Sequence, residues 1–85
     1  MSARRKYSLT IQAYSEAQQI LPGYNSLQFI NLGTSNAIIN NQISLITNQT
    51  FTVEDEQDRE CESQLSLSFD NTATNLCILV RKDLL

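Results

Sequence analysis

The segment Leu65-Ser66-Leu67-Ser68-Phe69 alternates apolar and polar side chains without interruption. Because successive side chains of a β-strand point to opposite faces, the two leucines and Phe69 share one face and the serines share the other. This alternation predicts a strand with one buried and one solvent-facing side, as is common in antiparallel sheets. We therefore interpret the rest of the chain as further strands around one hydrophobic core.

Short apolar segments recur on both sides of this strand. They predict further strands at residues 27–32, 37–39, 43–46, 50–53 and 76–80. Residues 76–80 are apolar on both faces, which is typical of a central strand. The intervening turns are rich in Asn and Thr, and Asn40 and Asn41 tolerate the positive φ that a tight hairpin turn requires. We also expect residues 64–69 and 76–80 to form a hairpin about Thr72.

The N-terminal part of the chain alternates as well. Four apolar or aromatic residues fall on one side of this segment: Tyr7, Leu9, Ile11 and Ala13. The pattern predicts a half-buried strand. A helix is the competing interpretation, since part of the segment has helical spacing and Ser15 with Gln18 resembles a capping box. Ser, Thr, Tyr and Ile favour a pleated surface, so we favour the strand, followed by a turn at Pro22-Gly23.

These patterns place the chain in the all-β class. About seven short strands joined by tight turns, with no convincing helix, predict a small antiparallel β-sandwich or a jelly-roll-like barrel. A chain of 85 residues is long enough for one hydrophobic core, so we expect a single domain over residues 1–85. So small a core gives marginal stability, and we expect a partner subunit to complete its burial.

The composition excludes several classes of function. The chain has no His, which removes Ser-His and Cys-His catalysis and His-containing zinc sites. A net charge of −3 argues against specific binding of nucleic acid, because phosphate recognition needs a basic surface. No apolar run approaches the roughly 18 residues of a membrane span, so we expect no membrane partner. We likewise expect no catalytic residues, no metal site and no cofactor.

The charged residues are segregated into a basic N-terminal arm, residues 1–6, and an acidic loop, residues 54–62. The charged candidates for an interaction site are Arg4, Arg5, Lys6, Glu54, Glu56 and Asp58. We interpret the acidic loop as a solvated connection between strands. A salt-linked contact with the basic arm of another subunit and a calcium site are the alternatives, although the spacing does not match an EF-hand loop.

Two pairs of side chains are open to both a structural and a functional interpretation. Tyr14 and Tyr24 are candidates for a ligand-binding face, or they are strand and turn residues with one edge in solvent. In the expected hairpin, Cys77 lies opposite Leu67 and not opposite Cys61. We therefore expect Cys77 to be a buried free thiol, with a disulfide between the two cysteines as the alternative.

Three stretches of strand-like sequence carry a resemblance to a known group of proteins. They are Phe29-Ile30-Asn31-Leu32-Gly33, then Asn36-Ala37-Ile38-Ile39-Asn40-Asn41-Gln42-Ile43-Ser44-Leu45, and the closing Thr74-Asn75-Leu76-Cys77-Ile78-Leu79-Val80. With the polar insertion between the last two, residues 27–85 resemble small β-sandwich virion proteins of bacteriophages. These are capsid decoration, head-fibre-base and spike-base proteins, several of them trimeric. The resemblance implies a non-enzymatic subunit that assembles in the host cytoplasm and docks on a capsid through its termini or one sheet face.

We therefore expect a structural subunit of a bacteriophage virion that acts through protein–protein assembly. Its expected partners are copies of itself, with a trimer favoured, and other capsid or virion proteins. The segregated charge and the uncharged polar surface fit this expectation, because amides and hydroxyls form hydrogen bonds at wet interfaces. The alternative is a small ligand- or carbohydrate-binding β-sandwich module that uses Tyr14 and Tyr24.

Overall fold

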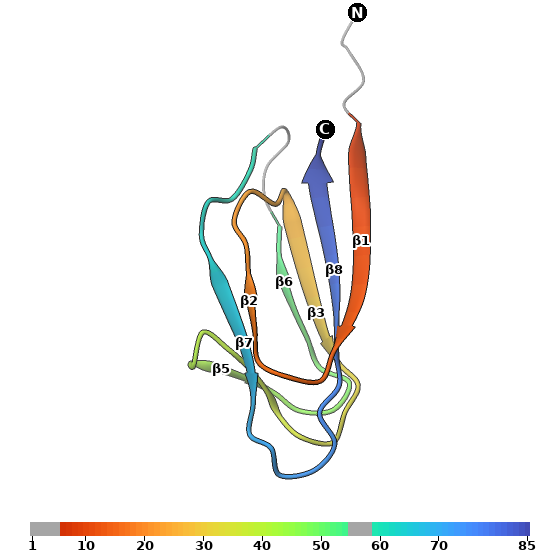
Figure 1. Ribbon diagram of the computed structural model, residues 1–85, viewed down its shortest axis with the longest axis vertical. Helices are drawn as coiled ribbons and strands as arrows, with labels where there is room; N and C mark the ends of the chain where they lie inside the picture. The colour runs from red at the N-terminus through yellow and green to blue at the C-terminus, as the bar shows by residue number, and fades with distance from the viewer. Residues whose placement is uncertain (1–5, 55–58) are drawn as a thin grey trace, which may run out of the picture.

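In the computed structural model, residues 6–54 and 59–85 are described and form eight antiparallel strands in two four-stranded sheets (Figure 1). Sheet A has the strand order β1 (Tyr7–Tyr14), β8 (Cys77–Leu84), β3 (Ser26–Asn31) and β6 (Thr50–Val53). Sheet B has the order β2 (Gln18–Ile20), β7 (Leu65–Phe69), β4 (Ala37–Ile39) and β5 (Ile43–Leu45). The predicted all-β sandwich is confirmed.

The core lies between the two sheets and follows from the alternation along the strands. In β7 the side chains of Leu65, Leu67 and Phe69 are buried, whereas the two serines between them are partly exposed, as predicted. The buried hydrophobic residues are Ile20, Tyr24, Leu27, Phe29, Ala37, Ile39, Leu45, Leu65, Leu67, Phe69, Cys77 and Leu79. Burial of each large apolar side chain among them contributes about 1.5–3 kcal/mol, so this cluster supplies the main driving force for folding.

Asparagine closes the tight turns. The predicted hairpin of residues 37–39 and 43–46 is present as β4 and β5, and Asn40 and Asn41 have φ values of 53° and 57°. Asn48 and Asn71 also have positive φ, at 68° and 59°. Asn takes up this left-handed conformation more readily than other residues with a side chain, which explains how the chain forms its turns with little glycine.

The predicted hairpin between residues 64–69 and 76–80 is wrong. β7 pairs with β2 and β4 in sheet B, whereas β8 pairs with β1 and β3 in sheet A, so the connection crosses from one sheet to the other. Hydrogen bonds from other turns hold this connection in place: the N–H groups of Thr34 and Ser35 both donate to the Thr74 carbonyl at 2.9 Å. β2 was not predicted, because its three residues are too few to show a period.

β1 is a strand, as predicted, but it is not half-buried. Seven of its eight residues are exposed and Tyr14 alone is partly buried. β1 is the edge strand of sheet A beside β8, and Figure 1 shows these two long strands running together along one side of the molecule. The strands of sheet B have only three to five residues, and the exposure of β1 shows that sheet B does not cover it.

A buried amide joins the two sheets where β3 ends. Asn31 is 0% exposed, and its side-chain N–H groups donate to the carbonyls of Ser35 and Leu45 at 2.9 and 2.8 Å. Its side-chain oxygen accepts a hydrogen bond from the Gly33 N–H at 3.1 Å. Leu45 belongs to β5 of sheet B, so one side chain of sheet A holds a turn and the opposite sheet together.

Replacement of this amide tests its contribution. Asn31→Asp keeps the shape but loses both N–H donations, and it leaves a buried carboxyl group facing two carbonyl oxygens. We expect the free energy of unfolding in urea to fall by about 2–3 kcal/mol. The control Gln42→Glu makes the same amide-to-acid change at an exposed turn position and is expected to change stability by less than about 0.5 kcal/mol. Equal losses of stability in the two variants would contradict the conclusion that the buried Asn31 amide stabilises the fold.

Candidate functional site

The side of sheet A that faces away from sheet B is apolar along β1 and β8, whereas β3 and β6 present mostly polar residues there. Leu27, Phe29 and Leu79 point into the core, so the residues next to them in β3 and β8 point outward. The strand register aligns these outward residues in rows across the sheet: Ile11 beside Val80, and Ala13 beside Ile78 and Ile30. We call the following set the outer apolar face: Leu9, Ile11, Ala13, Ile30, Ile78 and Val80.

The outer apolar face is in contact with solvent. Leu9 is 56% exposed and Ile11 is 66% exposed, although both lie in the middle of a regular strand. The corresponding outer side of sheet B is mostly polar, since its register brings together Gln19, Ser66, Ser68 and Ser44 with only Ile38 among them. Contiguous exposed apolar surface on a soluble protein marks a binding site, so the difference between the two sides singles out sheet A.

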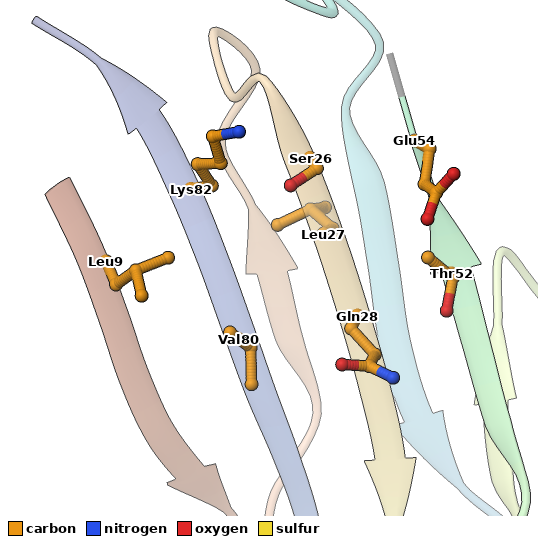
Figure 2. Close-up of a pocket in the computed structure, with 8 residues that line it drawn as sticks. All are labelled: Leu9, Ser26, Leu27, Gln28, Thr52, Glu54, Val80 and Lys82. Atoms are coloured by element: carbon orange, nitrogen blue, oxygen red, sulfur yellow. The ribbon is translucent and has the colours of Figure 1, made fainter. Parts of the chain in front are cut away.

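A shallow groove of about 230 Å³ crosses the outer side of sheet A. Figure 2 shows Leu9 and Val80 on the β1 and β8 side of the groove, and Gln28 and Thr52 on the β3 and β6 side. The residues that line it are Leu9, Ser26, Leu27, Gln28, Thr52, Glu54, Val80 and Lys82. The groove therefore combines an apolar side with a polar one, as the core and rim of a protein interface do.

Lys82 and Glu54 lie on opposite sides of one end of this groove (Figure 2). The Lys82 ammonium group lies 4.8 Å from the centroid of the Tyr7 ring, within range of a cation–π contact. The aromatic ring and the cation thus lie where the outer apolar face meets the polar end of β8. This arrangement can orient a partner by charge, while the apolar residues supply the contact area.

The opposite side of β8 is held by Arg81. Its guanidinium group donates hydrogen bonds to the Leu21 and Pro22 carbonyls at 2.8 and 3.2 Å, and it forms an ion pair with Asp83 at 2.8 Å. It also lies 5.7 Å from the centroid of the Tyr24 ring. These contacts fix β8 against the loop that follows β2, and so they fix the strand in the middle of the outer apolar face.

The two candidate tyrosines do not form a common exposed surface. Tyr24 is 0% exposed and its hydroxyl donates to the Ser63 carbonyl at 3.1 Å, so the expectation of a solvent-facing edge is wrong for this residue. Its large ring fills the core beside Arg81, which the turn sequence around Pro22-Gly23 does not reveal. Tyr14 is partly exposed and its hydroxyl donates to the Gln12 side chain at 2.6 Å.

The charged candidates are only partly within the described residues. Lys6 and Glu54 are both exposed, and Glu54 lines the groove. Arg4, Arg5, Glu56 and Asp58 lie outside the described residues, and so does the proposed contact between the basic arm and the acidic loop. Within residues 6–54 and 59–85, no group of three or more Cys, Asp or Glu side chains is placed to hold a metal ion.

The outer apolar face was not predicted, although its residues gave a signal. The alternation of residues 7–13 correctly predicts which side chains share a face, but the prediction that this face is buried in the core is wrong. Residues 76–80 are apolar on both sides, which predicts a central strand. β8 is a central strand, but one of its apolar sides faces solvent and not a second layer.

The chain has no match among protein-family models, among curated proteins or among solved structures. The part of the chain that the structure describes has no helix long and apolar enough to cross a membrane. Its candidate function therefore rests on the geometry of sheet A and on the sequence.

Cys77 is a free thiol and is fully buried in the core, as predicted. Burial raises the pKa of the Cys77 thiol from its ordinary value of 9.0 to about 11. The thiolate form is therefore scarce at neutral pH, and Cys77 is a core residue and not a nucleophile.

This raised pKa predicts a loss of stability at alkaline pH. Between pH 9 and 11 the native thiol keeps its proton while the unfolded chain loses it, so the free energy of unfolding falls as pH rises. We expect a loss on the order of 1–2 kcal/mol by pH 10.5, measured by urea unfolding. The Cys77→Ala variant is less stable at every pH but lacks this part of the pH dependence. If the free energy of unfolding of the two proteins depended on pH in the same way, the raised pKa of Cys77 would be contradicted.

Proposed function

We propose that this protein is a non-enzymatic structural subunit that acts by assembling with copies of itself and with larger protein structures. The observation that carries the proposal is the exposed outer apolar face of sheet A, opposed to the mostly polar outer side of sheet B. An apolar sheet side in water is unfavourable by about 25 cal/mol per Å², and burial against protein recovers that free energy.

The resemblance to bacteriophage virion proteins gives this assembly a setting. We propose that the chain is a capsid decoration, fibre-base or spike-base protein, incorporated into virions in the host cytoplasm. A sandwich with two apolar strands on one outer side and a mostly polar opposite side suits a subunit that covers another surface with the first side and faces solvent with the other. The resemblance favours a trimer, and a mass measurement distinguishes a trimer from other assemblies.

Self-assembly is tested by light scattering after size-exclusion chromatography at physiological salt. We expect a mass above that of the 9.6 kDa chain. The variant Ile11→Lys places a charge on the outer apolar face. We expect it to raise the dissociation constant of self-assembly at least about tenfold, because burial of an unpaired charge costs several kcal/mol.

The matched control is Ile43→Lys on β5, an exposed isoleucine at the far edge of sheet B. Lysine keeps its ammonium group in water at such an edge, so we expect the control to assemble like the unmodified chain. A chain that stays monomeric at millimolar concentration would overturn the proposal. So would equal assembly of the Ile11→Lys and Ile43→Lys variants.

The proposal that the chain is a virion protein is tested on purified phage virions. Purified virions of a phage that encodes this chain are expected to contain it in multiple copies, detected by mass spectrometry and removed only by conditions that dissociate the particle. The Ile11→Lys variant, supplied in place of the unmodified chain, is expected to be lost from the particles while the Ile43→Lys variant is retained. Absence of the unmodified chain from intact virions would contradict this setting.

A further inference from the structure

β1 is an edge strand without the usual protection against pairing. It has eight residues, and between Tyr7 and Tyr14 it contains no charged residue, no Pro and no Gly. The other edge strands of the described sheets are short, with four residues in β6 and three each in β2 and β5. Natural proteins protect sheet edges with charges, prolines, bulges or short strands, because an unprotected edge pairs with another strand.

The register shows which backbone groups of β1 are directed to the open edge. The Leu85 N–H donates to the Lys6 carbonyl at 2.9 Å, so Lys6 and Leu85 form a hydrogen-bonded pair with β8. Such pairs alternate along an antiparallel ladder, so the even-numbered residues of β1 bond to β8. The N–H and C=O groups of the odd-numbered residues therefore point away from β8: Tyr7, Leu9, Ile11 and Ala13.

We propose that two copies of this chain pair antiparallel along their β1 strands, with Thr10 facing the partner's Thr10 across a two-fold axis. This inference rests on the proposed function and names the strand through which two copies of the chain first associate. In this register Tyr7 pairs with the partner's Ala13 and Leu9 pairs with the partner's Ile11. All four outward-directed residues of each copy then form hydrogen bonds, about eight in total, and the two sheets A become one continuous sheet.

The other registers use fewer of these groups. Facing residues must lie on the same side of the sheet, so the register can shift only by steps that place an odd residue opposite an odd one. A centre at Ile11 moves Tyr7 opposite the partner's Ser15, beyond the end of β1. A centre at Leu9 moves Ala13 beyond Lys6 of the partner strand. The centre at Thr10 alone keeps every outward-directed residue paired.

The side chains and charges of β1 are compatible with a second copy. Pairing of identical strands usually brings like charges together, which is destabilising, but residues 7–15 carry none. The large ring of Tyr7 faces the small side chain of the partner's Ala13, and two β-branched threonines meet at the axis, where facing side chains are closest. On the solvent side, Leu9 and Ile11 join the two outer apolar faces.

Disulfide cross-linking tests the register. Thr10→Cys places two thiols across the two-fold axis, where the Cα atoms of a non-hydrogen-bonded pair lie about 4.5 Å apart, within the range of a disulfide. Gln12→Cys is the matched control: it is exposed on the same side of β1, but the two Gln12 positions lie more than about 13 Å apart along the strands. Both variants are oxidised with oxidised glutathione, and dimers are measured on non-reducing gels beside the unmodified chain.

We expect the Thr10→Cys dimer to form at least tenfold faster than the Gln12→Cys dimer. A second variant, Ile11→Pro, removes an N–H that points to the open edge and no bond to β8, so the fold is retained by circular dichroism and dimerisation is lost. Assembly with equal cross-linking of the two cysteine variants, a trimeric mass, or dimerisation of Ile11→Pro would overturn this inference and leave the proposed function standing. A monomer at every concentration would overturn both.

Discussion

The sandwich depends on the buried amide of Asn31, because this side chain connects the end of β3 to β5 in the opposite sheet. The same residue also holds the turn before β6, since its N–H donates to Gln49 and its carbonyl accepts from Asn48. Gly33 follows two residues later, and a side chain there would overlap the backbone of Thr74 and Leu76. The turns at this end of the molecule are therefore fixed closely against one another, and the direction of β3 and β8 is fixed with them.

The two sheets differ in extent. β8 pairs over its whole length with β1, while sheet B has no strand longer than five residues. The core is complete without β1, whose side chains contribute only Tyr14 to it. The core of the single chain therefore does not account for the apolar residues of β1 and the outward residues of β8, and the proposed burial against another protein would give them a role.

Much of the fold could be predicted from local pattern, but the exposure of the outer apolar face could not. The alternation in residues 65–69 predicted a strand, and the Asn residues between residues 39 and 43 predicted a hairpin turn, because both features depend on residues close together in the sequence. Alternation also showed that Leu9 and Ile11 share a face, but period two does not say whether that face is inside or outside. By contrast, contacts between residues far apart in the sequence, among them those of Arg81, determine that β8 belongs to sheet A. Contacts of the same kind bury Tyr24, so local pattern predicts neither result.

The two surfaces of sheet A use different groups, and so they are compatible with one another. Pairing of edges takes place in the plane of the sheet through backbone N–H and C=O groups, and it leaves the side chains on both sides accessible. A two-fold axis perpendicular to the sheet places both outer apolar faces on the same side of the pair. In the proposed dimer, edge pairing alone therefore does not bury the outer apolar faces but brings two of them together, and they remain exposed for association with further copies or with a larger assembly. In the proposed assembly, the strand that the core does not need is thus the strand along which two copies pair.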